Sequence, residues 1–571
     1  MKRPPIGRLV ALFCCMAIAL GAIFVRLTVL QVSQAADLKD RAVSQRVRTV
    51  ELPAQRGQIL DRSGEHFALS LPARDVYADP RYVSDGWASA GALSPLLEVD
   101  VDVLREKLTS DTTFVYLARQ VDLDVAERIE DLALPGIGFL EASARSYPAG
   151  PLAAQVLGFV GIDGGGLAGL ELQYQDVLVG TPGERTQEID PFGKPIVGGV
   201  DVEQPPVAGS SVVTTLDREL QFQAQEALGE AVATQHARGG TVIVMDPRSG
   251  DVLAMASYPW FDPNAFEQAK PGTYRNRAVT DASEPGSTNK VITAAAAIQE
   301  RALPLDERLS VPWTMRVGGY TIHDANPHGL MRMTLGDIIA ESSNIGAVQV
   351  ANRLGQSTLS TYLTRFGLGR PTGVGFPGES PGIVQPLSEW TESSLATVAY
   401  GQGIAATPLQ MISVYATIAN RGRWVQPRLV SATIAPDGTR HEAPASPTRR
   451  VVSAASARMV TRMLAYAVEH GTGGNAEIAG YQVAGKTGTA RIPDPARGGY
   501  IEGRYIASFI GFLPAGRPEV VVAAILDRPS QGYGGLAAAP LFQRVARAAI
   551  ARLSIEPAER VGFPPHALET R

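Results

Sequence analysis

The sequence predicts an α+β protein with an antiparallel sheet flanked by helices, preceded by an elongated mixed α/β region and one transmembrane helix. Three observations support this fold class. An apolar run lies near the N-terminus, strand-like runs lie at residues 241–256 and 506–526, and mostly helical sequence separates these runs. Strands at both ends of a region with helices between them favour one sheet that carries helices on both faces.

Composition limits the possible classes of function. The chain has 571 residues, too many for one ordinary domain, and 45% of them are hydrophobic, so it can bury large cores. Its net charge is −5 and no strong basic run follows the N-terminus, so we expect no nucleic-acid partner. The two cysteines, Cys14 and Cys15, lie in the N-terminal apolar run. The remainder therefore has no cysteine nucleophile and no cysteine metal site.

The N-terminal segment predicts a membrane anchor. An uncharged apolar run, 9–25, is followed by Arg26 and a second apolar piece, 27–32. A helix of about 17–25 apolar residues can span a bilayer, and basic residues before it favour an N-terminus inside the cell. We therefore assign 1–8 to a cytoplasmic N-terminus and 9–32 to the anchor. The basic residues that precede the run are Lys2, Arg3 and Arg8.

The alternative to an anchor is a cleaved signal peptide. Ser33-Gln34-Ala35 resembles a cleavage site. The apolar part of a cleaved signal usually has about 7–15 residues, whereas this run is longer and carries Arg26 before the site. We prefer the uncleaved anchor, and both alternatives place the remainder of the chain outside the cytoplasm.

The first extracytoplasmic region, 40–205, is rich in proline, glycine and acidic residues and has only short periodic segments. Helical spacing occurs at 101–108 and 122–134. No catalytic set is apparent, so we interpret this region as a spacer or docking domain. Its charged residues Arg56, Arg62 and Glu171 are expected to bridge parts of it.

The second region, 210–555, contains the predicted sheet, and 556–571 reads as a loose tail. Two β-rich runs around a Pro/Gly turn predict a hairpin. The expected elements are a helix at 217–233, the hairpin strands 241–245 and 252–256, strands 506–512 and 520–526, and a closing helix at 539–553.

The first chemical motif is Ser287-Thr288-Asn289-Lys290, preceded by a Pro-Gly turn and followed by an alanine-rich helix. Ser287 is then at a helix start, where free N–H groups and the helix dipole favour negative charge. Lys290 is three residues on and shares its face. A desolvated lysine can take the proton of a serine hydroxyl. Alone the motif is weak, because serine caps followed by lysine are common.

Two further motifs follow in the chain. Ser342 and Asn344 lie just after a helical segment. The hydroxyl of Ser342 can relay a proton, and the amide of Asn344 can both donate and accept hydrogen bonds. Lys486-Thr487-Gly488-Thr489 follows an apolar approach that is typical of a strand edge. It does not have the spacing of a phosphate-binding loop. Ser-x-x-Lys, Ser-x-Asn and Lys-Thr-Gly in this order are the signature of penicillin-binding proteins and serine β-lactamases.

With these motifs the chain resembles the class B, monofunctional penicillin-binding proteins over nearly its whole length. Flanking stretches match too, and residues 74–80 are more similar to the cell-division, FtsI-like subgroup than to the elongation subgroup. No glycosyltransferase domain precedes residue 40. One departure is Asn289, where the family usually has an apolar residue. The other matching stretches are 56–64, 166–171, 261–264, 399–403 and 533–535.

The resemblance implies a peptidoglycan D,D-transpeptidase that β-lactams inhibit, with a penicillin-binding/β-lactamase-like catalytic domain and a dimerisation or pedestal domain. It implies no metal and no cofactor. The implied partners are stem peptides ending in D-Ala-D-Ala, an amine acceptor, the cytoplasmic membrane, an FtsW-type glycosyltransferase and other divisome proteins at the septum.

The resemblance also assigns roles. Ser287 is the nucleophile, Lys290 its base, Ser342 the proton relay and Asn344 the residue that orients Lys290. Lys486, Thr487, Gly488 and Thr489 bind substrate, and the N–H groups of Ser287 and Thr489 form the oxyanion hole.

Three alternatives stay open: a serine β-lactamase or β-lactam sensor, an elongation-type transpeptidase, and a non-catalytic divisome scaffold. No Glu-x-x-x-Asn element for activating a deacylating water is recognisable, and intact Ser287, Lys290 and Lys486 disfavour a scaffold. His323 and His328 are interpreted as structural or surface residues, because Lys290 makes a histidine base unnecessary. Tyr400 is expected either to line the cleft or to pack in the core.

Overall fold

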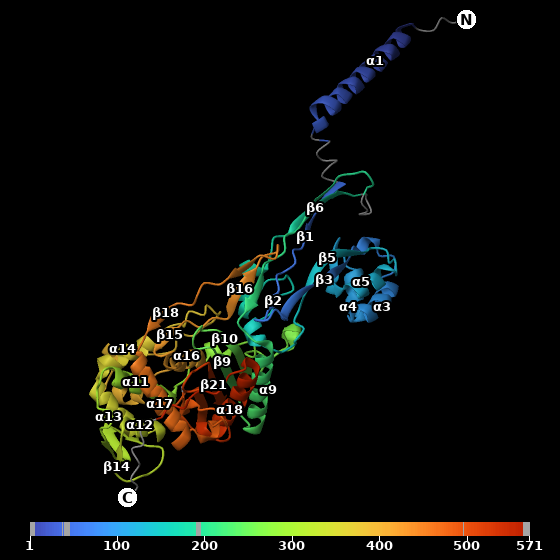
Figure 1. Ribbon diagram of the computed structural model, residues 1–571. Coiled ribbons are helices and arrows are strands. Elements are labelled where there is room, and N and C mark those ends of the chain that lie inside the picture. The colour runs from blue at the N-terminus through green and yellow to red at the C-terminus, as the bar shows by residue number, and fades with distance from the viewer. Residues whose placement is uncertain (1–5, 37, 39–45, 190–195, 495, 563–571) are drawn as a thin grey trace. The chain divides into compact units, whose positions relative to one another are not determined.

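The computed structural model describes residues 6–36, 38, 46–189, 196–494 and 496–562 (Figure 1). Lys2, Arg3 and most of the predicted tail lie outside this part of the chain. The chain divides into two compact units, one formed by Met1–Gln55 with Gly180–Ala208 and the other by Arg56–Val179 with Gly209–Arg571. The predicted boundaries at 40–205 and 210–555 remain predictions.

The first unit contains an apolar helix and a small sheet. Helix α1 spans Ile6–Thr28 and continues as a π-helical turn over Val29–Ser33. The apolar part of this 28-residue segment has a mean hydropathy of 2.4, and none of that part is buried against the protein. The segment is therefore long and apolar enough to span a bilayer. A signal sequence would meet the same criterion. The antiparallel sheet is formed by β1 (Val47–Leu52), β6 (Gly183–Glu188) and β7 (Asp201–Gln204).

The second unit begins with a mixed sheet that joins distant parts of the sequence. Strand β2 pairs in parallel with β8 and antiparallel with β3, and β3 pairs with both β4 and β5. Helices α3, α4 and α5 cover β3 and its neighbours around Val76, Leu93 and Leu104. The strands are β2 (Ile59–Leu60), β3 (His66–Ala78), β4 (Val115–Asp122), β5 (Ile137–Ser146), β8 (Ser211–Thr214), β16 (Val430–Ile434) and β17 (Arg440–Glu442), and the helices are α3 (Gly86–Leu97), α4 (Val101–Leu108), α5 (Leu123–Glu130), α6 (Ala154–Leu157), α7 (Gly169–Gln173) and α8 (Gln175–Leu178).

Strand β3 corrects the expectation that this region holds only short periodic segments, because it is 13 residues long. Pro72 and the polar residues around it interrupt the hydrophobic alternation, so no long strand was recognisable. The expected bridging is present for Arg56, whose Nε lies 2.7 Å from Glu171 Oε2, and Arg145 contacts the other oxygen at the same distance. Arg62 donates its backbone N–H to the carbonyl of Leu216.

The catalytic sheet has five strands in the order β10-β9-β21-β20-β19, and every neighbouring pair is antiparallel. This confirms the α+β prediction, the hairpin and both later strands. The strand β19, which carries Lys486, lies at an edge of the sheet. The strands are β9 (Gly239–Met245), β10 (Val252–Tyr258), β19 (Ala484–Pro493), β20 (Tyr500–Leu513) and β21 (Val520–Asp527).

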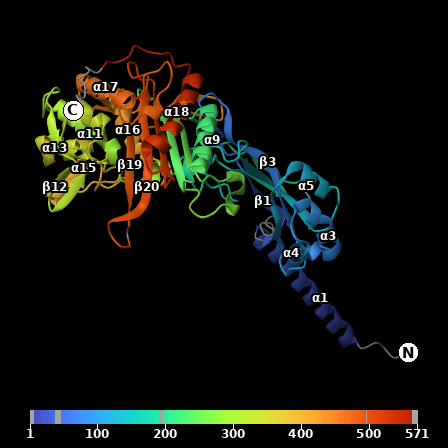
Figure 2. The ribbon, with the colours of Figure 1, turned by 90° about the horizontal axis from the view of Figure 1, so that it is seen from below.

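Alternate residues of each strand face opposite layers of helices. Val242 and Val244 pack in one core with α9 (Arg218–Thr234) and α18 (Gly534–Leu553). Ile243 and Met245 pack in the other core, with the helices of the middle region. Figure 2 shows α9 and α18 on one side of the sheet and α16 and α17 on the other. Helix α18 begins five residues before the predicted start, because Gly534 packs directly onto the sheet.

The middle region was expected to be mostly helical, and the structure adds two small two-stranded antiparallel sheets to it, one of them a β-hairpin nested within the other. In the hairpin, Gly318 and Gly319 have φ of +53° and +84°, which suits a tight turn. The sheets are β12 (Thr314–Val317) with β13 (Tyr320–His323) and β11 (Leu309–Val311) with β14 (Met331–Met333), and the helices are α10 (Arg277–Thr280), α11 (Lys290–Gln299), α12 (Leu335–Ala340), α13 (Asn344–Leu354), α14 (Gln356–Phe366), α15 (Glu392–Ala399), α16 (Pro408–Ala419) and α17 (Ala454–His470).

Candidate active site

Ser287 lies in a single 3₁₀ turn, Gly286–Asn289, that leads into α11. The turn is held from two sides. Gly286 donates its N–H to the carbonyl of Gly401 at 3.0 Å, and the hydroxyl of Tyr415 on α16 donates to the carbonyl of Thr288 at 3.0 Å. Gly286 has a φ of +56°, which favours glycine. The backbone around Ser287 is therefore fixed before any substrate binds.

The amine of Lys290 is the centre of the polar cluster at Ser287. Its Nζ lies 3.1 Å from Ser287 Oγ, 2.8 Å from Asn344 Oδ1 and 2.5 Å from the backbone carbonyl of Ser342. The hydroxyls of Ser342 and Ser287 are 2.9 Å apart. The four residues that the sequence placed in one site thus come together from α11 and from the α12–α13 junction.

Lys290 is buried completely, with 0% of its surface exposed. Burial lowers the pKa of its amine well below the usual value, and the positive charge of Lys486 lowers this pKa further. Asp324 acts in the opposite direction but does not compensate. The lowered pKa favours the neutral form of the amine, which is the form able to accept the proton of Ser287.

The loop at Ser342 is held in an unusual conformation. Ser342 has a φ of +61°, in the left-handed region that residues other than glycine seldom adopt. Such strain persists only where the surroundings enforce it, and it is frequent at functional sites. Here the carboxylate of Asp324 accepts the N–H groups of Asn344 at 2.5 Å and of Ile345 at 3.0 Å, and the hydroxyl of Ser343 at 2.7 Å. One buried carboxylate thus anchors the start of α13.

Asp324 is a site residue that no sequence motif marks. It follows β13, and no periodicity or spacing relates it to Asn344, so only tertiary folding reveals its position. The carbonyl of His323 accepts Asn344 Nδ2 at 3.0 Å, and His328 Nε2 lies 3.0 Å from Asp324 Oδ2. Burial disfavours the charged form of His328, but hydrogen bonds to Gly329 and Asp324 outweigh it and raise its pKa. His323 therefore contacts Asn344, and His328 contacts Asp324, the carboxylate that anchors Asn344. Both histidines act at Asn344 and not at Ser287.

Lys486 and Thr487 lie at the edge strand β19 beside this cluster. Lys486 is almost completely buried, with 1% of its surface exposed. Its Nζ donates to Thr487 Oγ1 at 3.1 Å and to Thr472 Oγ1 at 3.3 Å. Burial, only partly opposed by Glu341, lowers the pKa of Lys486 to about 7. The hydroxyl of Thr472 lies 2.8 Å from that of Thr487. Thr472 follows α17, 14 residues before Lys486, and no sequence motif marks it.

Gly488 and Thr489 fix how closely β19 approaches the nucleophile turn. A Cβ on Gly488 would lie 2.9 Å from Thr288 Cγ2 and 2.3 Å from Ser508 Oγ. Glycine is therefore required here by close packing. The hydroxyl of Thr489 accepts the N–H of Gly534 at 3.1 Å. These contacts bring the third motif against the first.

Asn289, the residue that departs from the family pattern, is fully buried. Its Nδ2 donates to the carbonyl of Val398 at 2.8 Å, whereas its Oδ1 has no hydrogen-bond partner among the described residues. Tyr400 is 7% exposed and packs in the main core, which favours the core alternative for this residue. Within the described part of the chain, no group of three His, Cys, Asp or Glu side chains is placed to hold a metal ion.

A serine hydroxyl beside a buried lysine of lowered pKa, with a second serine, an asparagine and a Lys-Thr-Gly edge strand, defines a serine acyltransferase of the penicillin-recognising type. The family model for the penicillin binding protein transpeptidase domain matches residues 240–547, and the model for the penicillin-binding protein dimerisation domain matches residues 51–214. The chain belongs to the penicillin-binding protein transpeptidases.

Curated relatives cover most of the chain. It is 39% identical to penicillin-binding protein PbpB of Mycobacterium tuberculosis, over 90% of this chain and 81% of the relative. It is 34% identical to peptidoglycan D,D-transpeptidase FtsI of Escherichia coli, over 96% and 92%. Among solved structures it is similar to penicillin-binding protein 3 of M. tuberculosis complexed with aztreonam, with a TM-score of 0.72, 34% identity, and coverage of 90% and 99%.

Proposed function

We propose that this protein is a peptidoglycan D,D-transpeptidase that cross-links stem peptides through an ester on Ser287. The observation that carries the proposal is the fully buried amine of Lys290, 3.1 Å from Ser287 Oγ. Membership of the transpeptidase family and the likeness to FtsI and PbpB support the same reaction. The two chemical steps below assign a role to each residue of the cluster.

In the first step, Lys290 takes the proton of the Ser287 hydroxyl, and Oγ attacks the carbonyl between two D-alanines. The N–H groups of Ser287 and Thr489 stabilise the oxyanion, a type of contact whose removal typically costs about 100- to 1,000-fold in rate. The C–N bond breaks, and Ser342, 2.9 Å from Ser287 Oγ, passes a proton to the departing D-alanine. The product is an acyl ester on Ser287.

In the second step, an amine of a neighbouring stem peptide attacks this ester. A new C–N bond forms, the C–O bond to Ser287 breaks, and the amine's proton returns to the serine oxygen through Lys290. Asn344, 2.8 Å from Lys290 Nζ, orients the lysine and the donor amide. Lys486, Thr487 and Thr489 hold the terminal carboxylate, and Gly488 permits the close approach of their strand.

The proposal places the enzyme at the cytoplasmic membrane. Residues 9–32 form the anchor with 1–8 inside the cell, and the regions 40–205 and 210–555 are extracytoplasmic. The length and apolar character of α1 support the anchor. The similarity to FtsI supports a role at the division septum, where an FtsW-type glycosyltransferase and other divisome proteins are the partners.

Covalent labelling of the detergent-solubilised full chain tests the site. Benzylpenicillin should add once, on the peptide that contains Ser287, and Ser287→Ala should not react. An adduct on another residue, or no adduct on the folded chain, contradicts the site. Rapid turnover of nitrocefin in place of a stable adduct indicates a β-lactamase.

Depletion in living cells tests the cellular role. Cells that lose the protein should grow into filaments, because septal cross-linking stops while elongation continues. Rounding of the depleted cells indicates the elongation type of transpeptidase. Normal division with Ser287→Ala as the sole copy indicates a scaffold.

A further inference from the structure

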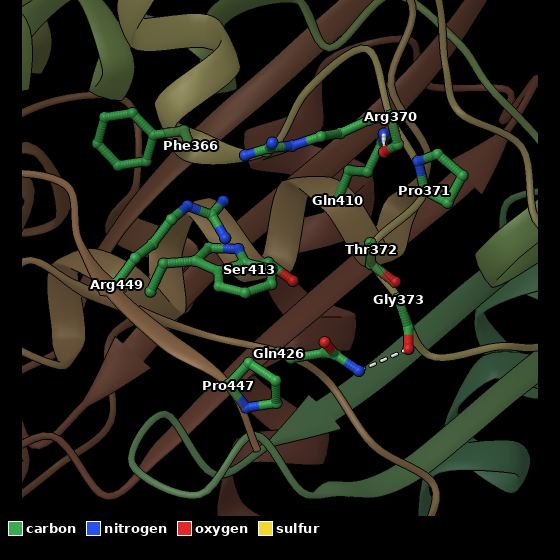
Figure 3. A pocket seen from close by; sticks show the side chains of 12 residues that line it. Phe366, Arg370, Pro371, Thr372, Gly373, Gln410, Ser413, Gln426, Pro447 and Arg449 are labelled. Atoms are coloured by element: carbon green, nitrogen blue, oxygen red, sulfur yellow. Dashed lines mark hydrogen bonds between the residues drawn. The ribbon is translucent and has the colours of Figure 1, made fainter.

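The catalytic region has a pocket of about 310 Å³ that none of the three motifs lines. It is bordered by the end of α14, the first half of α16 and the two-stranded antiparallel sheet formed by β15 (Arg423–Val425) and β18 (Thr448–Arg450) (Figure 3). Phe366, Pro371 and Pro447 supply apolar surface, and Gln410 and Ser413 of α16 supply polar groups. The pocket is therefore part apolar and part polar, as small-molecule sites commonly are.

Two arginines dominate the charge of this pocket. Figure 3 shows the side chains of Arg370 and Arg449 extending into it from different segments, with their guanidinium groups on the same side. No aspartate or glutamate is among the residues that line it. Arg370 donates to the carbonyl of Thr364 at 3.0 Å, and Arg449 Nε to the carbonyl of Arg365 at 3.2 Å. Both contacts are to neutral carbonyls, so within the described residues the two positive charges have no counter-ion.

Arg449 is held rigidly in spite of this uncompensated charge. Its guanidinium carbon lies 3.6 Å from the centre of the Trp424 ring, in a cation–π contact. Its Nη2 is buried, and no described residue accepts a hydrogen bond from it. Burial and the neighbouring charge of Arg370 lower the pKa of Arg449 to about 10. A buried, unsatisfied, charged donor beside a like charge is unfavourable, and a bound acceptor of negative charge would relieve both penalties.

We propose that this pocket binds an oxyanion, the carboxylate or phosphate group of a small ligand, between Arg370 and Arg449. The planar guanidinium fork matches both groups with paired hydrogen bonds, which a lysine does not provide. Stacking on Trp424 fixes the fork of Arg449 in advance, so little side-chain entropy is lost on binding. The apolar residues then contact the uncharged part of the ligand. The inference does not depend on the proposed function, because Ser287 takes no part in it.

Direct binding to the detergent-solubilised full chain tests the proposal. Inorganic phosphate and acetate are titrated separately by calorimetry, with sodium chloride holding the ionic strength constant. We expect saturable binding of at least one anion. Binding of phosphate alone identifies a phosphate ligand, and binding of acetate alone identifies a carboxylate ligand. Absence of saturable binding of both anions overturns the proposal.

Substitutions locate the anion. Arg370→Gln and Arg449→Gln should each raise the Kd about 10- to 100-fold, the loss of one charged hydrogen-bonding partner. Arg370 is exposed, so its substitution tests the site even if Arg449→Gln does not fold. Arg365→Gln is the matched control, since this exposed neighbour does not line the pocket, and it should leave the Kd unchanged. Equal binding by Arg370→Gln and the parent protein overturns the proposal.

Discussion

The carboxylate of Asp324 accepts the backbone N–H of Asn344 at 2.5 Å, joining the end of the β13 hairpin to the first turn of α13. The same carboxylate holds the hydroxyl of Ser343. Asn344 in turn contacts Lys290 Nζ, so Asp324 acts on the nucleophile through two intervening residues. It is a positioning residue that touches neither Ser287 nor Lys290 by a hydrogen bond.

Replacing Asp324 by alanine should therefore impair both stability and acylation. The four hydrogen bonds to its charge, that of His328 included, are worth about 1.5–3 kcal/mol each at most, and they overlap, so we expect a loss of about 2–4 kcal/mol in the free energy of unfolding. Benzylpenicillin acylation should slow at least about tenfold, with Asp324→Asn intermediate. Denaturant unfolding and stopped-flow acylation measure the two effects. The exposed Asp306→Ala is the control, and equal behaviour of the two variants contradicts the positioning role.

Lys290→Ala should lose acylation far more than it loses ligand binding, because a general base contributes about 100- to 10,000-fold. Lys290→Arg should fail too, since arginine stays protonated. In the parent protein the lowered pKa of Lys290 extends the availability of the neutral base to lower pH, and protonation removes the base as the pH falls through that pKa. The acylation rate should therefore decline on the acid side. Rates within a few-fold of the parent for either variant contradict the assignment.

Lys486 should make stability depend on pH in a defined direction. Its pKa is about 7 in the folded protein, against 10.5 for an ordinary lysine. Between these values the unfolded chain binds more protons, so the contribution of Lys486 to the free energy of unfolding rises with pH, by up to about 1.4 kcal/mol per unit. Lys486→Met should lack this slope. Urea unfolding of both proteins at pH 7, 8 and 9 measures it, and parallel curves contradict the burial effect.

Asn289→Leu should stabilise the protein. The buried Oδ1 of Asn289 has no partner among the described residues, a cost of about 1–3 kcal/mol. Removing the amide leaves the carbonyl of Val398 satisfied, because Gly401 also donates to it at 3.1 Å. We expect a gain of about 1 kcal/mol in the free energy of unfolding and acylation within a few-fold of the parent. Asn289→Ala, which creates a cavity, should destabilise instead. A lower melting temperature for Asn289→Leu shows that the amide contributes more than its unpaired oxygen costs.

The mature protein should retain residues 9–32. The apolar helix is long enough to span, and its basic flank favours an uncleaved anchor with the N-terminus inside. N-terminal sequencing of the membrane-extracted protein measures this. A mature chain that begins at Ala36 or Asp37 shows that the segment is a cleaved signal peptide.

Much of the catalytic fold was predictable because its elements have strong local signals. The runs that became β9, β10 and β21 are continuously apolar, and α9 has the helical periodicity and the Asp217 cap that mark its start. The hairpin around Gly318 and the long strand β3 were not predicted. The hairpin residues are mostly exposed or half-exposed, and β3 mixes buried apolar residues with Pro72 and polar residues, so neither period dominates the pattern.

Within the site, the sequence alone predicts the relation of Ser287 to Lys290, because residues three apart at a helix start share one face. It also determined which motifs belong together, through their order and residue types. Only the folded structure reveals that Asp324 anchors Asn344 and that Thr472 contacts Lys486. It also decided that Arg370 and Arg449 share one pocket. These contacts join segments far apart in the chain, and local periodicity carries no information about distant neighbours. The same holds for the pKa of Lys290, because burial and the charge of Lys486 exist only once the chain has folded.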